Sequence, residues 1–431
     1  MCFCISFRLL TTNYCLLTQM ADGDAKIDMS VIDAEVRKVP PFRSIIKIVD
    51  TLVAQAFFAR SSDVHLDPEE HTLRVRFRID GVLHDVYAFP KELHQEIITR
   101  IKVLSAMRTD EHQAAQDGRM RIVIPENPPV DVRVSITPTY FGENCVMRLL
   151  IARANDFTIK DLGFSPHNLE IIGRAMKKPY GLILATGPTG SGKTTTLYMV
   201  LKELNKPEIS IITIEDPIEY SLPGVDQIQV NAKTGLTFAN GLRSILRQDP
   251  NIVMVGEIRD GETANIAVNA AMTGHLVLST LHTNDAPTTL PRLLDLGVEP
   301  FLIASTLNIA IGQRLVRTIC PDCKVKKELT EEEMKGLTDA FPAELLKGNH
   351  VFYRGEGCAR CSGSGYKGRV GIHEVLEVTE EIRTLMMRRA NADEMRAAAI
   401  KAGMVTMTVD GFEKARQGMT TLEEVLRVFH E

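Results

Sequence analysis

Apolar residues between positions 42 and 60 recur at the spacing of one helical face, which predicts an amphipathic helix. Apolar and polar residues then alternate strictly over residues 73–79, as in a strand with one buried face. Asp80-Gly81 follows as a hairpin turn signal. A second helix is expected over residues 91–107, and a second strand pair over 120–124 and 130–136. Together these patterns predict a small α+β domain at residues 42–151.

The pattern changes after residues 152–168, a polar stretch with turn residues that we expect to be a linker. Four apolar runs follow, LILAT, ISIITIE, NIVMVGE and HLVLSTL, and helical stretches separate them. Strands that alternate with helices predict a parallel sheet with crossover helices. We therefore expect an α/β domain over residues 169–431. Residues 315–370 within it carry paired cysteines, and helical sequence follows them.

Residues 1–41 have no such periodicity, and their apolar runs are broken by Thr and Asn. We expect a disordered leader. A secretory signal peptide is the alternative, but it requires a cleaner apolar core and a small-residue cleavage site. A second alternative is that translation starts at Met20 or Met29.

Composition narrows the possible functions. The chain has 431 residues, 44% hydrophobic and 24% charged, and a formal net charge of -5. This is the composition of a globular protein, and no overall basic field favours nucleic acid. No run reaches the ~18 uninterrupted apolar residues that a membrane span needs. We expect no nucleic-acid partner and no direct membrane insertion, so any association with a membrane would go through another protein.

The stretch GPTGSGKTTT follows the first apolar run of the larger domain and fits the phosphate-loop pattern GxxxxGK[ST]. Glycines let backbone N–H groups point at phosphate oxygens, while the lysine and the following Thr reach the β/γ-phosphates and Mg²⁺. A buried strand before and a helix after are the required context. We expect ATP and Mg²⁺ to bind here, with the following contacts: Gly187, Pro188, Thr189, Gly190, Ser191, Gly192, Lys193, Thr194 and Thr195.

Acidic and histidine residues end the neighbouring strands. Glu215 and Asp216 follow one run and Glu257 another, where a carboxylate can hold Mg²⁺ or polarise the attacking water. A helix N-cap is the ordinary role of a single acid at such a place. Two such positions beside a phosphate loop favour catalysis. His275 and His282 flank a further run, and His282 either senses the γ-phosphate or is structural.

Four cysteines form two CxxC pairs, Cys320 with Cys323 and Cys358 with Cys361, on either side of residues 324–357. Four thiolates leave no open coordination position, so the pattern predicts a structural site, and tetrahedral sulfur ligands favour zinc. A redox dithiol is the alternative for one pair alone. A zinc ribbon that reads nucleic acid would need basic clusters with interleaved aromatics, which are missing from the sequence.

The runs IEDPIEY, LRSILRQDPNIVMVGEIRD and AMTGHLVLSTLHTND, together with the phosphate loop, resemble the ATPases of type II secretion and type IV pilus assembly. They correspond to the family's Walker A, Asp box, atypical Walker B and His box, in the family's order. Upstream, SSDVHLDP, RVRFRIDGVL, QDGR and DVRVS resemble its smaller N-terminal domain. The cysteine quartet resembles the zinc subdomain of the assembly-type members. The resemblance covers residues 42–431.

The resemblance implies a homohexamer that binds ATP between the small domain and a RecA-like P-loop domain. It implies a cytoplasmic location, peripheral at the inner face of the plasma membrane, where an inner-membrane platform protein is the partner. Glu257 would activate water, with Glu215 and Asp216 assisting. The arginines that match the family's nucleotide site are Arg133, Arg148, Arg243, Arg247 and Arg369. Two alternatives share the P-loop core: a nucleic-acid motor ATPase and a small-molecule kinase.

Overall fold

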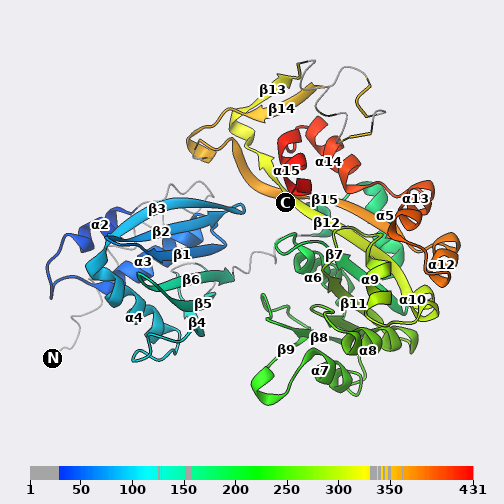
Figure 1. The fold of residues 1–431 in the computed structure, drawn as a ribbon, viewed down its shortest axis with the longest axis horizontal. Coiled ribbons are helices and arrows are strands. Elements are labelled where there is room, and N and C mark those ends of the chain that lie inside the picture. The colour runs from blue at the N-terminus through cyan, green and yellow to red at the C-terminus, as the bar shows by residue number, and fades with distance from the viewer. Residues whose placement is uncertain are drawn as a thin grey trace, which may run out of the picture. The chain divides into compact units, whose positions relative to one another are not determined.

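The computed structural model describes residues 29–430, except 125–126, 128, 151–157, 331–336, 338–340, 343–344, 348–350 and 362. The leader's residues 1–28 and the linker's residues 152–157 therefore lie outside the described part of the chain. The chain divides into two compact units, Met1–Ala152 (unit 1) and Arg153–Glu431 (unit 2). Each unit has its own strands and helices (Figure 1).

Unit 1 is a six-stranded antiparallel sheet in the order β3-β2-β1-β6-β5-β4, with helices on one face. Its elements are α2 (Ser30–Val36), α3 (Ile45–Phe58), β1 (Asp63–Pro68), β2 (Thr72–Ile79), β3 (Val82–Pro90), η2 (Lys91–Leu93), α4 (His94–Leu104), β4 (Gln116–Ile122), β5 (Val130–Thr139) and β6 (Gly142–Leu150). Alternate residues of the strands, such as Val132 and Val134 of β5, join α3 and α4 in one apolar core. The opposite face of the sheet is left for polar side chains.

Unit 2 contains a seven-stranded sheet in the order β15-β12-β7-β11-β10-β8-β9. Its strands are β7 (Gly181–Thr186), β8 (Ile211–Glu215), β9 (Asp226–Gln229), β10 (Ile252–Val255), β11 (Leu276–Leu281), β12 (Leu307–Ile319) and β15 (Tyr366–Glu377). All neighbouring pairs are parallel except β12 with β15. A mixed sheet of this kind, beside the α+β fold of unit 1, confirms the predicted fold class.

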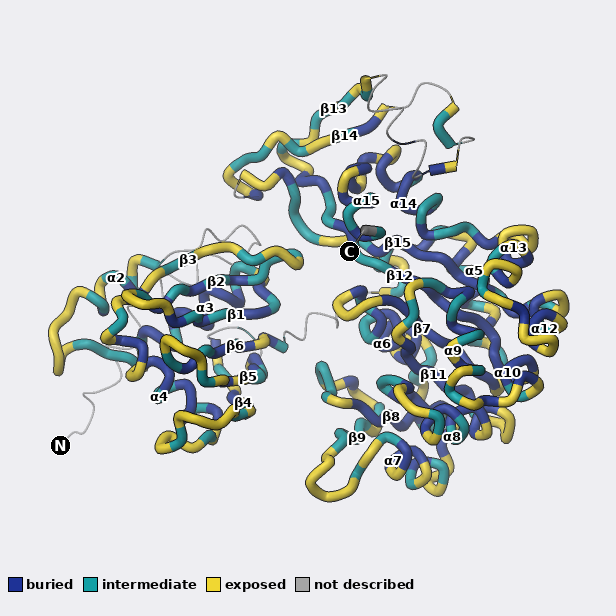
Figure 2. The backbone as a smooth tube through the Cα atoms, viewed as in Figure 1, coloured by how far each residue is buried: buried dark blue, intermediate teal, exposed yellow. Residues whose placement is uncertain are grey.

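Helices cover both faces of the unit 2 sheet, so its central strands are buried on both sides (Figure 2). Leu182 and Leu184 of β7 point into one apolar core, and Ile183 and Ala185 point into the other. The helices are α5 (Pro166–Met176), α6 (Lys193–Leu204), α7 (Phe238–Ile245), α8 (Gly261–Met272), α9 (Thr289–Asp295), α10 (Pro300–Thr306), α12 (Glu380–Met387), α13 (Ala392–Lys401), α14 (Met407–Arg416) and α15 (Leu422–His430), with short turns η4 (Ile159–Leu162) and η5 (Ala232–Thr234). This two-sided burial explains why the predicted runs are continuously apolar.

The cysteine region lies at the far end of the β12–β15 pair, whose register extends to Ile319 opposite Tyr366. It consists of η6 (Pro321–Cys323), β13 (Lys324–Glu328), β14 (Val351–Gly355) and η7 (Ala359–Cys361). β13 and β14 form a separate two-stranded sheet. Among the described residues, none of the helices combines the length and the apolar character of a bilayer-spanning segment.

Candidate active site

The phosphate loop joins β7, buried at every position, to α6. Gly187, Gly190 and Gly192 have φ values of 147°, 81° and 87°, in the region that favours glycine. At Gly187 space is also short, because a Cβ atom there would lie 2.4 Å from the carbonyl oxygen of Gln313. The glycines of the motif are therefore required by the backbone path of the loop.

Lys193, the first residue of α6, folds back over this loop. Its Nζ atom donates hydrogen bonds to the carbonyl oxygens of Gly187 (2.8 Å) and Pro188 (3.0 Å). Burial lowers the pKa of Lys193, while the Glu257 carboxylate acts in the opposite direction. Ser191 adds a buried hydroxyl that has no hydrogen-bond partner within the described residues. A cation and a free hydroxyl inside a glycine loop suit a phosphate group.

Glu257 and His282 lie at the same edge of the sheet as the loop. Glu257 follows β10 and His282 follows β11. The last residue of β11, Leu281, pairs with Thr186, which directly precedes the loop. The Glu257 carboxylate lies 2.6 Å from Arg259 Nη2 and 3.1 Å from His282 Nε2. These contacts hold the carboxylate at the edge where the predicted catalytic base belongs.

Glu215 lies in a different environment from Glu257, since its side chain is buried and both carboxylate oxygens already accept hydrogen bonds. Thr213 Oγ1 (2.6 Å) and Gln227 Nε2 (3.1 Å) donate to one oxygen, and the Tyr198 hydroxyl donates to the other. Burial raises the pKa of Glu215 despite these donors. The Glu215 carboxylate is thus buried and contacted by three donors, whereas the adjacent Asp216 is exposed.

Gln313 of β12 is a site residue that the sequence analysis missed. Its Nε2 donates to the Ser191 carbonyl oxygen (2.7 Å), and its Oε1 accepts from the Thr196 hydroxyl (2.8 Å). One amide thus ties the loop to α6. The signal that could have revealed it is a glutamine inside the apolar run LNIAIGQRL.

Four of the predicted residues lie on elements outside the phosphate loop. His275 precedes β11 at the edge where Leu276 pairs with Gly181, the start of β7, and its Nδ1 donates to the Ala270 carbonyl oxygen (3.0 Å). The others are Arg243, which pairs with Glu262 of α8 at 2.6 Å; Arg247, which donates to the Arg243 carbonyl oxygen at 2.9 Å; and Arg369, which lies opposite Arg317 near the cysteine end of β12.

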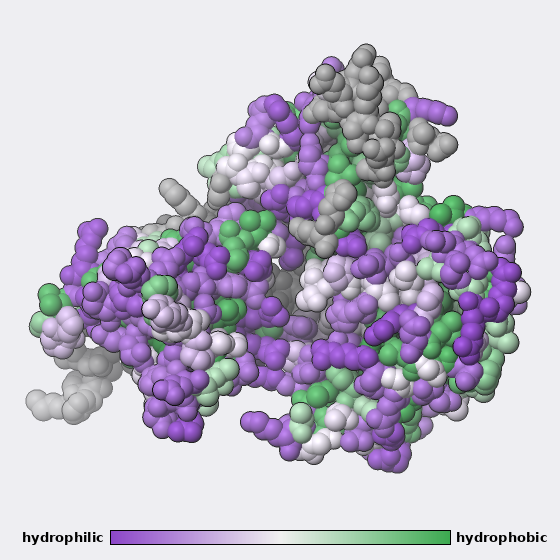
Figure 3. All heavy atoms as spheres, in the orientation of Figure 1, coloured by the Kyte–Doolittle hydropathy of each residue, from purple (hydrophilic) through white to green (hydrophobic). Residues whose placement is uncertain are grey.

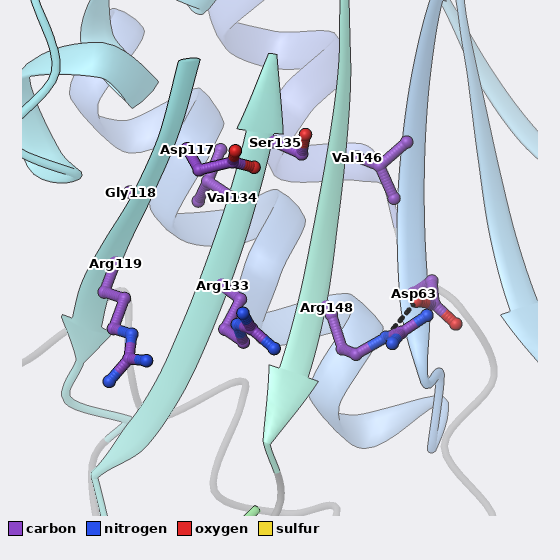
Figure 4. Close-up of a pocket in the computed structure, with 9 residues that line it drawn as sticks. All are labelled: Asp63, Asp117, Gly118, Arg119, Arg133, Val134, Ser135, Val146 and Arg148. Atoms are coloured by element: carbon purple, nitrogen blue, oxygen red, sulfur yellow. Dashed lines mark hydrogen bonds and ion pairs between the residues drawn. The ribbon is translucent and has the colours of Figure 1, made fainter. Parts of the chain in front are cut away.

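In unit 1, Arg133 and Arg148 lie directly opposite each other on β5 and β6, and Arg119 of β4 lies directly opposite Arg133. All three line a pocket of about 480 Å³ on the polar face of the sheet (Figure 4). Arg148 Nε donates to Asp63 Oδ1 at 2.9 Å. The face of unit 1 seen in Figure 3 is mostly hydrophilic, as this outward arrangement of charges requires.

The four cysteines of the CxxC pairs come together, with all their sulfur atoms within 4.8 Å of one another. The Sγ atoms of Cys320 and Cys358 are 3.8 Å apart, as are those of Cys323 and Cys361, and Cys358 and Cys361 are 3.7 Å apart. Zinc–sulfur bonds of about 2.3 Å in a tetrahedron require sulfur separations of about 3.8 Å. The cluster therefore fits a zinc ion.

Hydrogen bonds favour the thiolate at one of the four cysteines, Cys361, whereas burial raises the pKa of the Cys320 and Cys323 thiols. Burial raises the pKa of the Cys361 thiol, but the backbone N–H groups of Cys358 and Gly365 and the neighbouring thiols outweigh it. The resulting pKa is about 6. A thiolate is the form that binds metal.

Residues 41–427 match the family described as Type II/IV secretion system protein. The type II secretion system ATPase E of Vibrio cholerae is 48% identical over 387 residues, which cover 90% of this chain and 76% of that protein. The type IV pilus assembly ATPase PilB of Myxococcus xanthus is 43% identical over 410 residues, covering 94% and 72%.

Two solved structures resemble this chain in fold. The pilus retraction motor PilT with bound ADP has a TM-score of 0.60 and 26% identity, and the match covers 88% of this chain and 96% of PilT. The ATPase DotB of Legionella pneumophila has a TM-score of 0.66 at 21% identity, covering 92% and 98%. With the family match over most of the chain, these likenesses confirm the resemblance seen in the motifs: the chain belongs to the Type II/IV secretion system family of ATPases.

Proposed function

We propose that this chain hydrolyses ATP as a homohexamer to power type IV pilus assembly or type II protein secretion through an inner-membrane platform protein. The observation that carries the proposal is the placement of Lys193 and Glu257 after parallel strands at one edge of the sheet, in a member of a secretion ATPase family. The names of the relatives from Vibrio cholerae and Myxococcus xanthus support these two processes, type II secretion and type IV pilus assembly. The working location would be the inner face of the plasma membrane.

The proposed roles follow from what each side chain contacts. Lys193 exchanges the loop carbonyl oxygens for phosphate oxygens, and the backbone N–H groups of the loop donate to the same phosphates. Glu257 orients the attacking water, and His282, beside it, senses the γ-phosphate. Mg²⁺, when bound, would neutralise phosphate charge, and its candidate ligands are the Thr194 hydroxyl and the exposed Asp216 carboxylate. We assign Glu215 to assisting with metal and water from the end of β8, where Thr213, Tyr198 and Gln227 hold its carboxylate.

Arginines would supply the remaining positive charge. Arg133 and Arg148 would contact phosphate from the pocket of unit 1, because guanidinium groups stabilise the charge of phosphoryl transfer. We assign Arg243, Arg247 and Arg369 to junctions between neighbouring subunits of the hexamer, where guanidinium groups would act on phosphate across the junction. The cysteine cluster would hold one structural zinc ion in a subdomain at residues 315–370 of the P-loop domain, 169–431.

The first test is Lys193→Ala in the purified full-length chain, with Lys202→Ala on the exposed side of the same helix as control. We expect Lys193→Ala to lower ATP turnover by at least about 100-fold and Lys202→Ala to leave it within about twofold of wild type. Equal turnover in the two variants would refute the assigned site.

The second test distinguishes an ATPase that acts on the platform protein from one that acts on nucleic acid. ATP turnover is measured with the reconstituted platform protein in vesicles, with empty vesicles, and with single- or double-stranded DNA. Stimulation by the platform protein alone supports the proposal. Stimulation by DNA alone would favour the nucleic-acid alternative.

A further inference from the structure

Residues 283–286, the loop that follows His282, lie over a row of three residues on neighbouring strands of unit 2. Thr186 of β7 is directly opposite Gly312 of β12, which is directly opposite Glu374 of β15. The N–H of Thr283 donates to Thr186 Oγ1 at 3.1 Å, and Thr186 Oγ1 donates to the Thr283 carbonyl oxygen at 3.0 Å. Because Thr186 also directly precedes the phosphate loop, His282 and the phosphate loop are fixed to the same residue.

The other end of the 283–286 loop is fixed to Glu374. This side chain is buried, and its Oε1 accepts a hydrogen bond from the Ala286 N–H at 2.7 Å, while Oε2 accepts from the Met407 N–H at the start of α14 at 3.2 Å. Gly312 leaves the space for this contact, since a Cβ atom there would lie 2.9 Å from Glu374 Cγ and 3.0 Å from the Ala286 nitrogen. A residue without a side chain in the middle of the row thus allows the loop to reach β15.

Two carboxylates and one guanidinium group surround this loop. Nη2 of Arg396, on α13, lies 2.7 Å from Asp285 Oδ2, and Asp285 Oδ1 accepts from the Thr288 N–H at 2.8 Å. Burial raises the pKa of Glu374, and the charge of Asp285 raises it further, whereas Arg396 acts in the opposite direction. Arg396 therefore offsets the repulsion between the two acidic side chains that hold the loop.

We propose that Arg396 is a positioning residue for ATP hydrolysis, which holds the 283–286 loop so that His282 can contact the γ-phosphate. The inference rests on the proposed function, which assigns the γ-phosphate contact to His282. It adds a residue of the C-terminal helices to a site otherwise built from the phosphate loop and the strand ends. Arg396 acts through Asp285, since a catalytic contact needs neighbours that fix its position.

The test exploits the difference between ATP and ADP, because ADP lacks the γ-phosphate. Each full-length variant is titrated with ADP and with a non-hydrolysable ATP analogue, and the ratio of the two dissociation constants gives its preference for the triphosphate. A residue that positions the γ-phosphate contact changes this preference by weakening the analogue alone. A residue that only supports the fold weakens both ligands. Thermal unfolding without nucleotide is measured in parallel.

Arg396→Gln is compared with Arg388→Gln as matched control and with His282→Ala as benchmark. Arg388, at the end of α12, pairs with Glu394 of α13 at 3.3 Å, so both Gln variants remove an arginine–carboxylate contact of the same helix. Asp285→Asn is a second, independent variant. It keeps an oxygen that can accept from the Thr288 N–H and removes the charge that Arg396 contacts.

His282→Ala is expected to lower the preference for the triphosphate about tenfold, the effect of one hydrogen bond to a charged group. Arg396→Gln and Asp285→Asn are expected to lower it about fivefold, as residues of one hydrogen-bond network do, and Arg388→Gln to change it less than twofold. The double variant Arg396→Gln/His282→Ala is expected to equal His282→Ala, because Arg396 acts through His282.

The results that would overturn the inference differ in what they leave standing. If His282→Ala lowers the preference while Arg396→Gln and Asp285→Asn behave like Arg388→Gln, Arg396 does not position His282, but the proposed function survives. If Arg396→Gln weakens ADP and the analogue equally, its role is structural. If its effect adds to that of His282→Ala in the double variant, it acts by another route. If His282→Ala keeps the wild-type preference, the γ-phosphate assignment in the proposed function fails, and this inference fails with it.

Discussion

Tyr198→Phe should destabilise unit 2, because the Tyr198 hydroxyl is one of the few groups that stabilise the buried Glu215 carboxylate. Tyr198 is fully buried on α6, and its hydroxyl donates to Glu215 at the end of β8. Gln227 Nε2 also contacts this hydroxyl, at 3.3 Å. The contact joins the helix that begins with Lys193 to the strand that leads into Asp216.

The size of the effect follows from burial. Phenylalanine keeps the ring and its packing, so the main loss is the hydrogen bond to a carboxylate oxygen that stays buried without a donor. The two longer contacts that the hydroxyl accepts, from Gln227 Nε2 and from the Glu219 N–H, are lost with it. A hydrogen bond to a charged group contributes about 1.5–3 kcal/mol, and we expect the free energy of unfolding to fall by about 2 kcal/mol. For a unit of this size, that corresponds to a fall of about 5 °C in unfolding temperature.

Tyr220→Phe is the matched control. Its ring packs against that of Tyr198 with a centroid distance of 4.6 Å, but its buried hydroxyl has no hydrogen-bond partner within the described residues. Removing that hydroxyl should leave the stability unchanged or raise it. Thermal unfolding of the full-length variants, in a double-mutant cycle with Glu215→Gln, measures the coupling between Tyr198 and Glu215.

The pH dependence gives a second measurement of the same contact. Burial raises the pKa of Glu215 above its ordinary value of 4.5, so the folded chain binds this proton more tightly than the unfolded chain. The contribution of Glu215 to the free energy of unfolding is thus fully present below pH 4.5, and it is lost as the pH rises through the raised pKa. Glu215→Gln should remove this slope. A Tyr198→Phe variant as stable as Tyr220→Phe, with no coupling to Glu215, would refute the reasoning.

Two further predictions concern catalysis and the metal. Glu257→Gln should still bind ATP but hydrolyse it at least about 100-fold more slowly, whereas Glu203→Gln, at an exposed position of α6, should keep activity. ATP turnover and nucleotide-binding assays check both, and an active Glu257→Gln would remove Glu257 as the base. Cys320→Ser should lose one zinc per chain by elemental analysis and unfold at a lower temperature, because metal-binding energy is folding energy. Cys145→Ser, in unit 1, should keep its zinc. Native protein without zinc would contradict this prediction.

The sequence predicted those elements that a continuous or alternating apolar pattern marks. The four apolar runs of unit 2 correspond to β7, β8, β10 and β11, and the Asp80-Gly81 hairpin joins β2 to β3. It did not predict β1 or β12. The charged residues and the final proline of β1 hide its alternation, and β12 follows α10 without a loop and carries polar residues such as Gln313.

The site was predictable where one short segment defines it and not where separate strands meet. The loop, Lys193 and the strand-end acids are local motifs. The contacts of Gln313 with the loop, and the hydrogen bond from Tyr198 to Glu215, depend on how α6, β8 and β12 pack. The alignment of the arginines that line the unit 1 pocket depends on strand register, which the spacing of residues along the chain does not specify.

The charged groups proposed to act on ATP already have partners within their own units. Lys193 donates to loop carbonyl oxygens, Arg148 to Asp63, and Glu257 is paired with Arg259. Nucleotide binding therefore exchanges partners instead of filling empty positions, so the free energy gained is the difference between two sets of contacts. Only such a difference can shift a conformational equilibrium. In the proposed function this exchange takes place at Arg148 in unit 1 and at Lys193 in unit 2, so ATP binding would release Asp63 and the loop carbonyl oxygens from their present donors. A change of contacts that depends on the bound nucleotide is what a motor needs in order to convert hydrolysis into movement.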